Sequence, residues 1–257
     1  MIYKADNNVR QKLVEMFDDF DSTIVLSYLQ GHMGSAWVDN LENPTVAQIT
    51  VGIFVFYAGN PNAEEAEELL YNLPDFTLAI VDSDEWKKRI ETVHKGSIEK
   101  FQRFRFNKNP GDLDKEYIRD ILSTLPQNYE MKKIDKDIAK ASSFHALSED
   151  FTSQFDSIDD FIDRGVGYAI LNKGQVVSAA TSFSIFDDGI EIEIASHPEH
   201  RRKGLAKIVA SALILDCLDR EKYPSWDGAN VESVELAKKL GYTFKEPYDT
   251  YFIQIKK

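Results

Sequence analysis

The chain has a single cysteine among its 257 residues, Cys217, so no disulfide can form within it. Long hydrophobic runs are also missing, because no segment approaches the ~18 apolar residues that a membrane-spanning helix needs. The first residues do not resemble a signal peptide. Basic residues are scarce: 30 Lys and Arg stand against 43 Asp and Glu, for a net charge of −13. We therefore expect a cytoplasmic protein without nucleic acid or membrane partners, since its surface repels polyanions.

Apolar residues are plentiful, at 43% of the chain, and aromatic residues make up 12%. This composition is typical of a fully folded globular protein, and a length of 257 residues fits one large or two small domains, of which we expect two. The turn-rich stretch 107–114 lacks hydrophobic periodicity and marks the expected boundary. We predict an N-terminal α/β domain over residues 1–112, a linker helix over 113–128 and a second domain over 129–257.

The order of predicted elements in the second domain indicates an α+β fold. Turn signals at Lys173-Gly174 and Asp187-Asp188-Gly189 separate three strand-like runs and predict an antiparallel meander. The strands expected here cover 129–134, 167–171, 176–186, 190–196, 223–227 and 248–255, and the helices cover 136–144, 157–163, 204–218 and 231–240. The predicted class is a mixed, mainly antiparallel central sheet flanked by helices. The smaller α/β domain before it has alternating elements that are compatible with a degenerate copy of the same fold.

A basic segment containing one glycine joins a strand-like run to a long apolar helix. Its residues are Arg201, Arg202, Lys203, Gly204, Leu205 and Ala206. Three cations at a helix N-terminus oppose the helix dipole unless an anion binds there, and a glycine lets the backbone approach a phosphate closely. The segment therefore predicts the phosphate site of a nucleotide-type cofactor. The alternative is an ordinary basic start of a helix.

A second motif follows about 25 residues later and reads Asn230-x-x-Ser233-x-x-Leu236-x-x-x-Leu240-Gly241-Tyr242. Asn230 is a favourable N-cap for the helix, and Gly241 is a favourable residue just beyond its C-terminus. Asn230 is either a helix cap alone or a cap that also contacts the cofactor.

The two motifs together resemble those of the GCN5-related (GNAT) superfamily of acyl-CoA-dependent N-acyltransferases. The superfamily's signature, Q/R-x-x-G-x-G/A, is met by Arg201, Gly204 and Ala206. The wider pattern, HPEHRRKGLA followed by WDGAN-x-x-S-x-x-LAKKLGY, is similar to bacterial zwittermicin-resistance-type acetyltransferases. The resemblance implies acetyl-CoA as cosubstrate. It also implies that residues 201–206, Asn230 and Ser233 contact acetyl-CoA, and that a backbone N–H near Ala195 or Ser196 stabilises the thioester oxygen.

An amine must lose a proton before it attacks a thioester, so this chemistry needs a base. Glu193 and Glu191 are the candidates, because alternation puts both on one face of the strand-like run, and Glu193 is the first choice. The alternative for both is the solvent-facing edge of an amphipathic strand. Many superfamily members have a tyrosine as proton donor where this chain has Ala237, and Tyr251, Tyr248 or Tyr242 are the candidates to replace it.

The predicted function is transfer of an acetyl group to the primary amine of a small, cationic acceptor by direct attack, with the N-terminal domain forming a wall of the acceptor site. The alternative is a non-catalytic acyl-CoA-binding regulatory module. His197 and His200 have no third ligand at a suitable spacing, so no metal site is expected. Cys217 lies in the apolar stretch ALILDCLD and is interpreted as a buried structural thiol.

Overall fold

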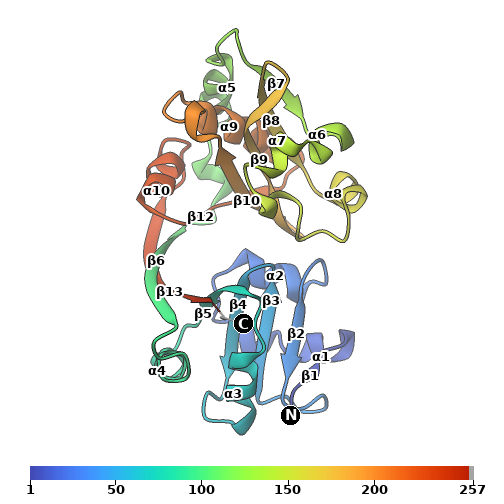
Figure 1. The fold of residues 1–257 in the computed structure, drawn as a ribbon, viewed down its shortest axis with the longest axis vertical. Coiled ribbons are helices and arrows are strands. Elements are labelled where there is room, and N and C mark those ends of the chain that lie inside the picture. Colours follow the sequence, from blue (N-terminus) through green and yellow to red (C-terminus); the bar gives the residue numbers. More distant parts are fainter. Residues whose placement is uncertain (255–257) are drawn as a thin grey trace. The chain divides into compact units, whose positions relative to one another are not determined.

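The computed structural model describes residues 1–254, which form two compact units (Figure 1). The first unit consists of Met1–Arg103 together with residues 247–254, and the second is Phe104–Glu246. The chain therefore crosses the boundary twice, within β6 (Ile98–Phe106) and within β13 (Phe244–Gln254). This division differs from the expected one, because the last strand belongs to the first unit and helix α5 (Lys115–Ser123) belongs to the second.

The first unit contains a sheet in the order β1-β2-β3-β4-β5-β13. Neighbouring strands are antiparallel except β4 and β5, which are parallel. The strands are β1 (Tyr3–Lys4), β2 (Ser35–Val38), β3 (Val46–Val51), β4 (Phe54–Gly59) and β5 (Phe76–Ile80). The helices are α1 (Asn7–Lys12), η1 (Glu15–Phe17), α2 (Thr23–Leu29), α3 (Glu64–Tyr71) and α4 (Asp84–Val93).

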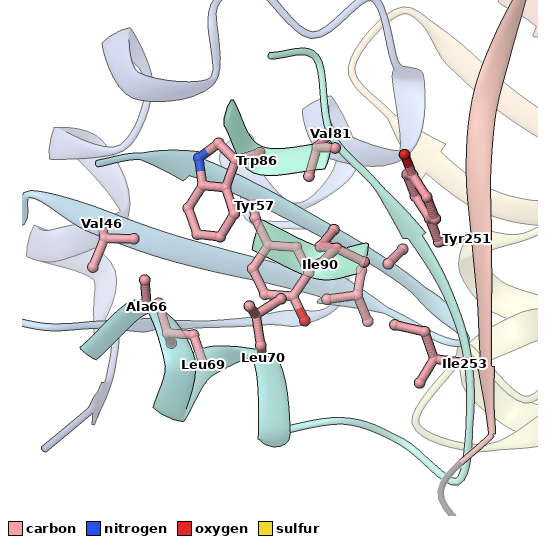
Figure 2. Close-up of a cluster of buried hydrophobic side chains, with 12 residues drawn as sticks. Val46, Tyr57, Ala66, Leu69, Leu70, Val81, Trp86, Ile90, Tyr251 and Ile253 are labelled. Carbon is pink, nitrogen blue, oxygen red and sulfur yellow. The ribbon is translucent and has the colours of Figure 1, made fainter. Parts of the chain in front are cut away.

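Large aromatic side chains form the centre of one buried cluster in the first unit (Figure 2). Tyr57 of β4 and Trp86 of α4 stack with their ring centroids 5.3 Å apart. Helix α4 starts at Ser83, whose side chain accepts a hydrogen bond from the Trp86 backbone N–H, and the Trp86 indole N–H donates to the Gly59 carbonyl at 2.9 Å. Tyr251 of β13 is fully buried in the same cluster. The C-terminal strand is thus part of this unit's core.

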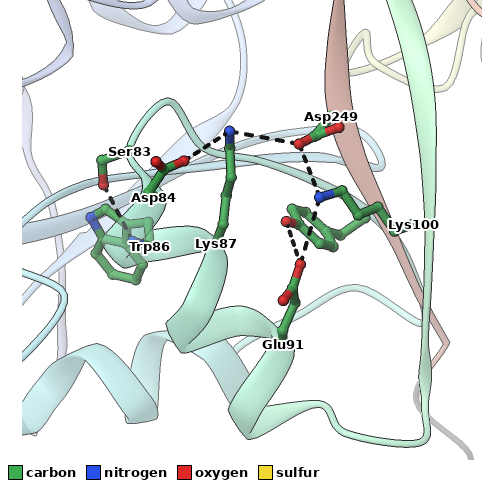
Figure 3. Close-up of polar contacts among 8 residues, drawn as sticks. Ser83, Asp84, Trp86, Lys87, Glu91, Lys100 and Asp249 are labelled. Carbon is green, nitrogen blue, oxygen red and sulfur yellow. Dashed lines mark hydrogen bonds and ion pairs between the residues drawn. The ribbon is translucent and has the colours of Figure 1, made fainter.

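Charged side chains fix β13 to α4 and β6 at the edge of this cluster (Figure 3). The Asp249 carboxylate lies 3.0 Å from Lys100 Nζ and 3.6 Å from Lys87 Nζ. The Tyr251 hydroxyl donates to the Glu91 carboxylate at 2.9 Å. Burial is the main cause that raises the pKa of Tyr251, to about 12, and the Glu91 carboxylate adds to it. These contacts indicate that Tyr251 stabilises the fold of the first unit.

Substitution of Tyr251 with phenylalanine tests whether its hydroxyl stabilises the fold. We expect the free energy of unfolding to fall by about 1 kcal/mol, the usual value of one hydrogen bond. Chemical denaturation measures the loss. A fall in kcat without a fall in stability would contradict this assignment and would restore Tyr251 as a proton donor.

The second unit contains a sheet in the order β11-β10-β9-β8-β7. Its strands run antiparallel except β10 and β11, which are parallel. The strands are β7 (Glu130–Lys133), β8 (Gly167–Asn172), β9 (Gln175–Phe186), β10 (Gly189–Ser196) and β11 (Tyr223–Ser225), and β12 (Asp227–Gly228) pairs with β6. The other elements are η2 (Pro110–Asp112), α6 (Lys136–Lys140), α7 (Ser142–His145), η3 (Glu149–Phe151), α8 (Ile158–Arg164), η4 (Pro198–His200), α9 (Leu205–Asp219) and α10 (Val231–Lys238). The predicted fold class, a mainly antiparallel mixed sheet flanked by helices, is confirmed.

The two units repeat one strand pattern. In each, four antiparallel strands lead through a helix, α3 or α9, to a fifth strand parallel to the fourth. The strand that follows the next helix crosses the unit boundary in each case: Phe104 and Arg105 of β6 pair with β12 within the second unit, and β13 pairs with β5 within the first. Helix α3 begins with Glu64, Glu65 and Glu67 where α9 follows a basic loop. The repeat supports a duplicated topology in which the first copy has an acidic helix start.

Most side chains of helix α9 are buried, and the helix contains the single cysteine. Cys217 is 2% exposed, and burial raises the pKa of its thiol to about 12. Among residues 1–254, no helix combines the length and the apolar character needed to cross a membrane.

The buried thiol gives a simple test of this packing. The thiolate is the reactive form of a cysteine, and the raised pKa of Cys217 disfavours that form at pH 8. We expect iodoacetamide to leave the folded protein unmodified and to label it once in urea. Mass spectrometry measures the label, and fast labelling of the folded protein would contradict the buried placement.

Candidate active site

Strand β11 runs beside only the first part of β10. The parallel register joins Gly189–Glu191 to Tyr223–Ser225, while β10 continues along β9 as far as Ser196. Beyond Trp226, β12 pairs with β6 rather than with β10. In the described part of the chain, the second half of β10 therefore has one strand neighbour, β9. The second half of β10 therefore has one backbone edge that no described strand pairs with.

The loop after β10 has a special backbone conformation. Arg202 has a φ of 60° and Gly204 a φ of 79°, and both lie in the left-handed region. A non-glycine residue rarely adopts this region, and such strain often accompanies a functional loop. A Cβ added to Gly204 would meet no atom within 4 Å. The space above Gly204 is therefore open to a ligand.

Charge and helix geometry at this loop fit a pyrophosphate group. Arg201, Arg202 and Lys203 are exposed, and within residues 1–254 none of them has an ion-pair partner. Helix α9 starts after Gly204 without a side-chain cap for its first N–H groups. Uncapped N–H groups and the helix dipole both favour an anion. Leu205 is buried under the helix start and Ala206 is half-buried, so neither side chain obstructs this surface.

Ala195 and Ser196 end β10 directly before the loop, and both are half-buried. Ser178 of β9 donates a hydrogen bond from its hydroxyl to the Ala195 carbonyl at 3.3 Å. The Ser178 and Ser196 hydroxyl oxygens lie 2.7 Å apart. These contacts fix the end of β10 against β9.

The two glutamates of β10 have different surroundings. Glu193 is half-buried, and its carboxylate accepts a hydrogen bond of 3.4 Å from the Ser148 hydroxyl. Glu191 is only 5% exposed and lies opposite Ser184 and Ser225 on the neighbouring strands. The register of β9 against β10 shifts between Glu191 and Ile192, because β9 has one extra residue there. Of the two carboxylates, Glu193 is the more accessible to an acceptor.

A second half-buried carboxylate, on η3, was missed by the sequence reasoning. Ser148 caps η3 and accepts a hydrogen bond from the Asp150 backbone N–H, so it links Glu193 to Asp150. Burial raises the pKa of Asp150, while hydrogen bonds from Ser153 and Gln154 oppose the shift. Ser148 precedes Glu193 by 45 residues. No local motif in the sequence predicts that Ser148 lies near Glu193, because their contact depends on the packing of η3 against β10.

Helix α10 begins and ends as its motif predicts. The Asn230 side chain accepts a hydrogen bond from the Ser233 backbone N–H at 2.9 Å, and the Ser233 hydroxyl accepts one from the Trp226 indole at 3.1 Å. Gly241, with a φ of 104°, ends the helix. Asn230 is therefore a helix cap, and Ser233 anchors the residue at which the chain leaves β11. A cofactor contact for either residue stays a prediction.

The tyrosines considered as proton donors lie at different places. Tyr242 is buried, and its hydroxyl donates to the Pro224 carbonyl at 2.6 Å. Burial is the main cause that raises the pKa of Tyr242 well above its ordinary value. Tyr251 and Tyr248 belong to the segment of β13 in the first unit. Ala237 is fully buried in α10. Glu193, Ala195, Ser196 and the basic loop therefore all belong to the second unit, whereas Tyr251 belongs to the first.

The histidines beside the loop face other residues of the protein. His197 Nδ1 accepts a hydrogen bond from the Glu199 backbone N–H at 3.3 Å, and His200 Nδ1 lies 3.0 Å from the Tyr129 hydroxyl. In the part of the chain that the structure describes, no group of three or more His, Cys, Asp or Glu side chains is arranged to hold a metal ion.

Comparisons with known proteins show similarity to acetyltransferases. Residues 14–251 match the family model for GNAT acetyltransferases. The chain is 30% identical over 255 residues to YdfB of Bacillus subtilis (strain 168), described as an uncharacterised N-acetyltransferase, and covers 94% of that protein with 93% of its own length.

Solved structures extend the likeness to the whole fold. A GCN5-related N-acetyltransferase-like protein from Streptococcus suis 89/1591 is 32% identical with a TM-score of 0.87, covering 94% of this chain and 97% of that one. A tandem GNAT protein from the clavulanic acid biosynthesis pathway is 8% identical with a TM-score of 0.56, covering 99% of this chain and 98% of that one. The second likeness concerns the fold alone.

Proposed function

Because the chain belongs to the GNAT acetyltransferase family, whose members use acetyl-CoA, we propose that its second unit binds acetyl-CoA and acetylates the primary amine of a small, cationic acceptor. One observation carries this proposal: an uncapped helix start and three exposed cations follow the end of β10, whose second half does not pair with β11. Anion-binding groups and an open strand edge are what a long, phosphate-bearing thioester requires.

In this proposal the loop binds the pyrophosphate, and the backbone edge of β10 orients the rest of the donor. Acetyl-CoA supplies a thioester, whose carbonyl carbon accepts the amine and whose sulfur leaves as a thiolate. A backbone N–H at Ala195 or Ser196 stabilises the negative charge that develops on the carbonyl oxygen. Much of the rate enhancement comes from holding the thioester and the amine in the correct relative orientation. Asn230 and Ser233 add contacts at the start of α10.

Glu193 is the proposed base, which takes a proton from the acceptor's ammonium group directly or through water. The partial burial of Glu193 and its hydrogen bond from Ser148 support this role over Glu191, which is 5% exposed. A carboxylate in a partly dry site is also a favourable partner for a cation before transfer. Ser148 also accepts a hydrogen bond from the Asp150 backbone N–H, so Asp150 is the second acidic residue that we propose for this region. Both residues favour a cationic acceptor over an acidic one.

A non-catalytic acyl-CoA-binding module is the second candidate, and the buried Ala237 at the usual proton-donor position favours it. A thiol-release assay with acetyl-CoA and a panel of polyamines, amino acids and aminoglycosides separates the two candidates. Release of CoA that depends on one amine, with a product 42 mass units heavier than that amine, supports the enzyme, since acetylation adds about that mass. Saturable acetyl-CoA binding without release for any amine supports the module.

A further inference from the structure

A tyrosine outside both sequence motifs contacts the segment before the phosphate loop. The Tyr129 hydroxyl lies 3.0 Å from His200 Nδ1. The two rings meet edge to face, with centroids 5.7 Å apart and an interplanar angle of 81°. Tyr129 precedes His200 by 71 residues, so the contact links the start of β7 to the end of η4.

Tyr129 is itself held firmly. Its backbone N–H donates to the Pro126 carbonyl at 3.0 Å, and the next residue starts β7, which pairs with β8. The adjacent Asn128 carbonyl accepts a hydrogen bond from the Asn172 side chain at 2.8 Å. These contacts hold the backbone of Tyr129 against the sheet.

His200, in contrast, lies on a short segment that leads into strained backbone. Element η4 is three residues long, and Arg202 follows it with a φ of 60°. A left-handed conformation is unfavourable for a non-glycine residue, so surrounding contacts must maintain it. The His200 side chain provides such a contact directly before the loop.

The protonation state of His200 suits this contact. Burial, followed by the positive charges of Lys203 and His197, lowers its pKa, and Glu199 opposes the shift. A neutral imidazole with its proton on Nε2 accepts a hydrogen bond from the Tyr129 hydroxyl at Nδ1. The lowered pKa favours the neutral form that accepts this hydrogen bond.

We propose that Tyr129 is a positioning residue, which acts through His200 to hold residues 201–204 in the conformation that binds the phosphates of acetyl-CoA. The inference rests on the proposed function, because it assumes that this loop is the phosphate site. Tyr129 contributes to recognition of the phosphorylated part of the donor, and the thioester end does not depend on it.

The test compares two donors in the full-length protein. Acetyl-CoA carries the pyrophosphate, whereas acetyl-pantetheine has the same thioester and no phosphate. We expect Tyr129→Phe to lower the ratio of kcat/KM for acetyl-CoA to that for acetyl-pantetheine by about five- to tenfold, the effect of one hydrogen bond. The change appears mainly in KM for acetyl-CoA. His200→Phe gives the same loss, and the double variant loses no more than either single one, because the two residues act as a unit.

Tyr168→Phe is the matched control. It also removes a tyrosine hydroxyl from the second unit, one that donates to Asp216 of α9 at 2.7 Å, so it lowers stability without changing the donor ratio. An unchanged ratio in both Tyr129→Phe and His200→Phe would overturn the inference and leave the proposed function intact. Failure of the unsubstituted protein to bind CoA in a calorimetric titration would instead overturn the proposed function, and the inference with it.

Discussion

Replacing Glu193 with glutamine lowers kcat by about 100- to 1000-fold, within the range that removal of a general base produces. The amide keeps the size and the hydrogen bond from Ser148 but cannot take a proton from the acceptor. Steady-state thiol release measures the loss, and calorimetry shows whether acetyl-CoA affinity is retained. Loss of kcat with retained affinity is the expected pattern, because the phosphate loop is a separate set of residues.

Glu130→Gln provides the matched control for this substitution. Glu130 lies on β7 in the same unit, is exposed, and undergoes the same change of charge. Its variant keeps the kcat of the unsubstituted protein. If Glu193→Gln also keeps that rate, Glu193 is not the base, and Glu191 becomes the candidate to replace next.

The double substitution Arg202→Glu, Gly204→Glu abolishes acetyl-CoA binding, with an affinity loss of at least about 100-fold. Two carboxylates replace a cation and an open glycine at a helix start that favours anions, and a few kcal/mol of lost electrostatic attraction gives that factor. A side chain at Gly204 also fills the open space above it and is strained at a φ of 79°. Isothermal titration with acetyl-CoA measures the change.

The chain offers a close control at the turn between β8 and β9. Lys173 and Gly174 have φ values of 51° and 79°, and an added Cβ at Gly174 also meets no atom within 4 Å. Lys173→Glu, Gly174→Glu therefore introduces the same strain and the same charge at another loop. Equal loss of affinity in both variants would show that the effect is one of net charge or folding rather than of a phosphate site.

The sequence predicts much of the second unit because its signals are local. The turns at Lys173-Gly174 and Asp187-Asp188-Gly189 separate β8, β9 and β10 in the structure as expected. Asn230 and Gly241 bound α10 in their predicted places, because caps act within one helical turn. The predicted helix 136–144 is two short helices in the structure, since Ala141 has extended backbone between α6 and α7.

Other features depend on contacts between distant parts of the chain. The sequence offers Tyr251 as one replacement for the proton donor missing at Ala237, but it does not reveal that β13 pairs with β5 and places Tyr251 in the core of the first unit. The hydrogen bond between Ser148 and Glu193 and the contact between Tyr129 and His200 likewise join residues 45 and 71 positions apart. Periodicity and spacing reveal which residues share an element, and they do not reveal which elements meet.

Isothermal titration of the intact protein with acetyl-CoA tests the central claim most directly. We predict saturable binding of one acetyl-CoA per chain, with a Kd of about 1 μM to 1 mM, the range in which KM values of enzymes usually lie. One equivalent is expected because α9 follows a basic loop, whereas α3 of the first unit begins with glutamates. Absence of saturable binding would contradict the claim that the second unit is an acetyl-CoA site.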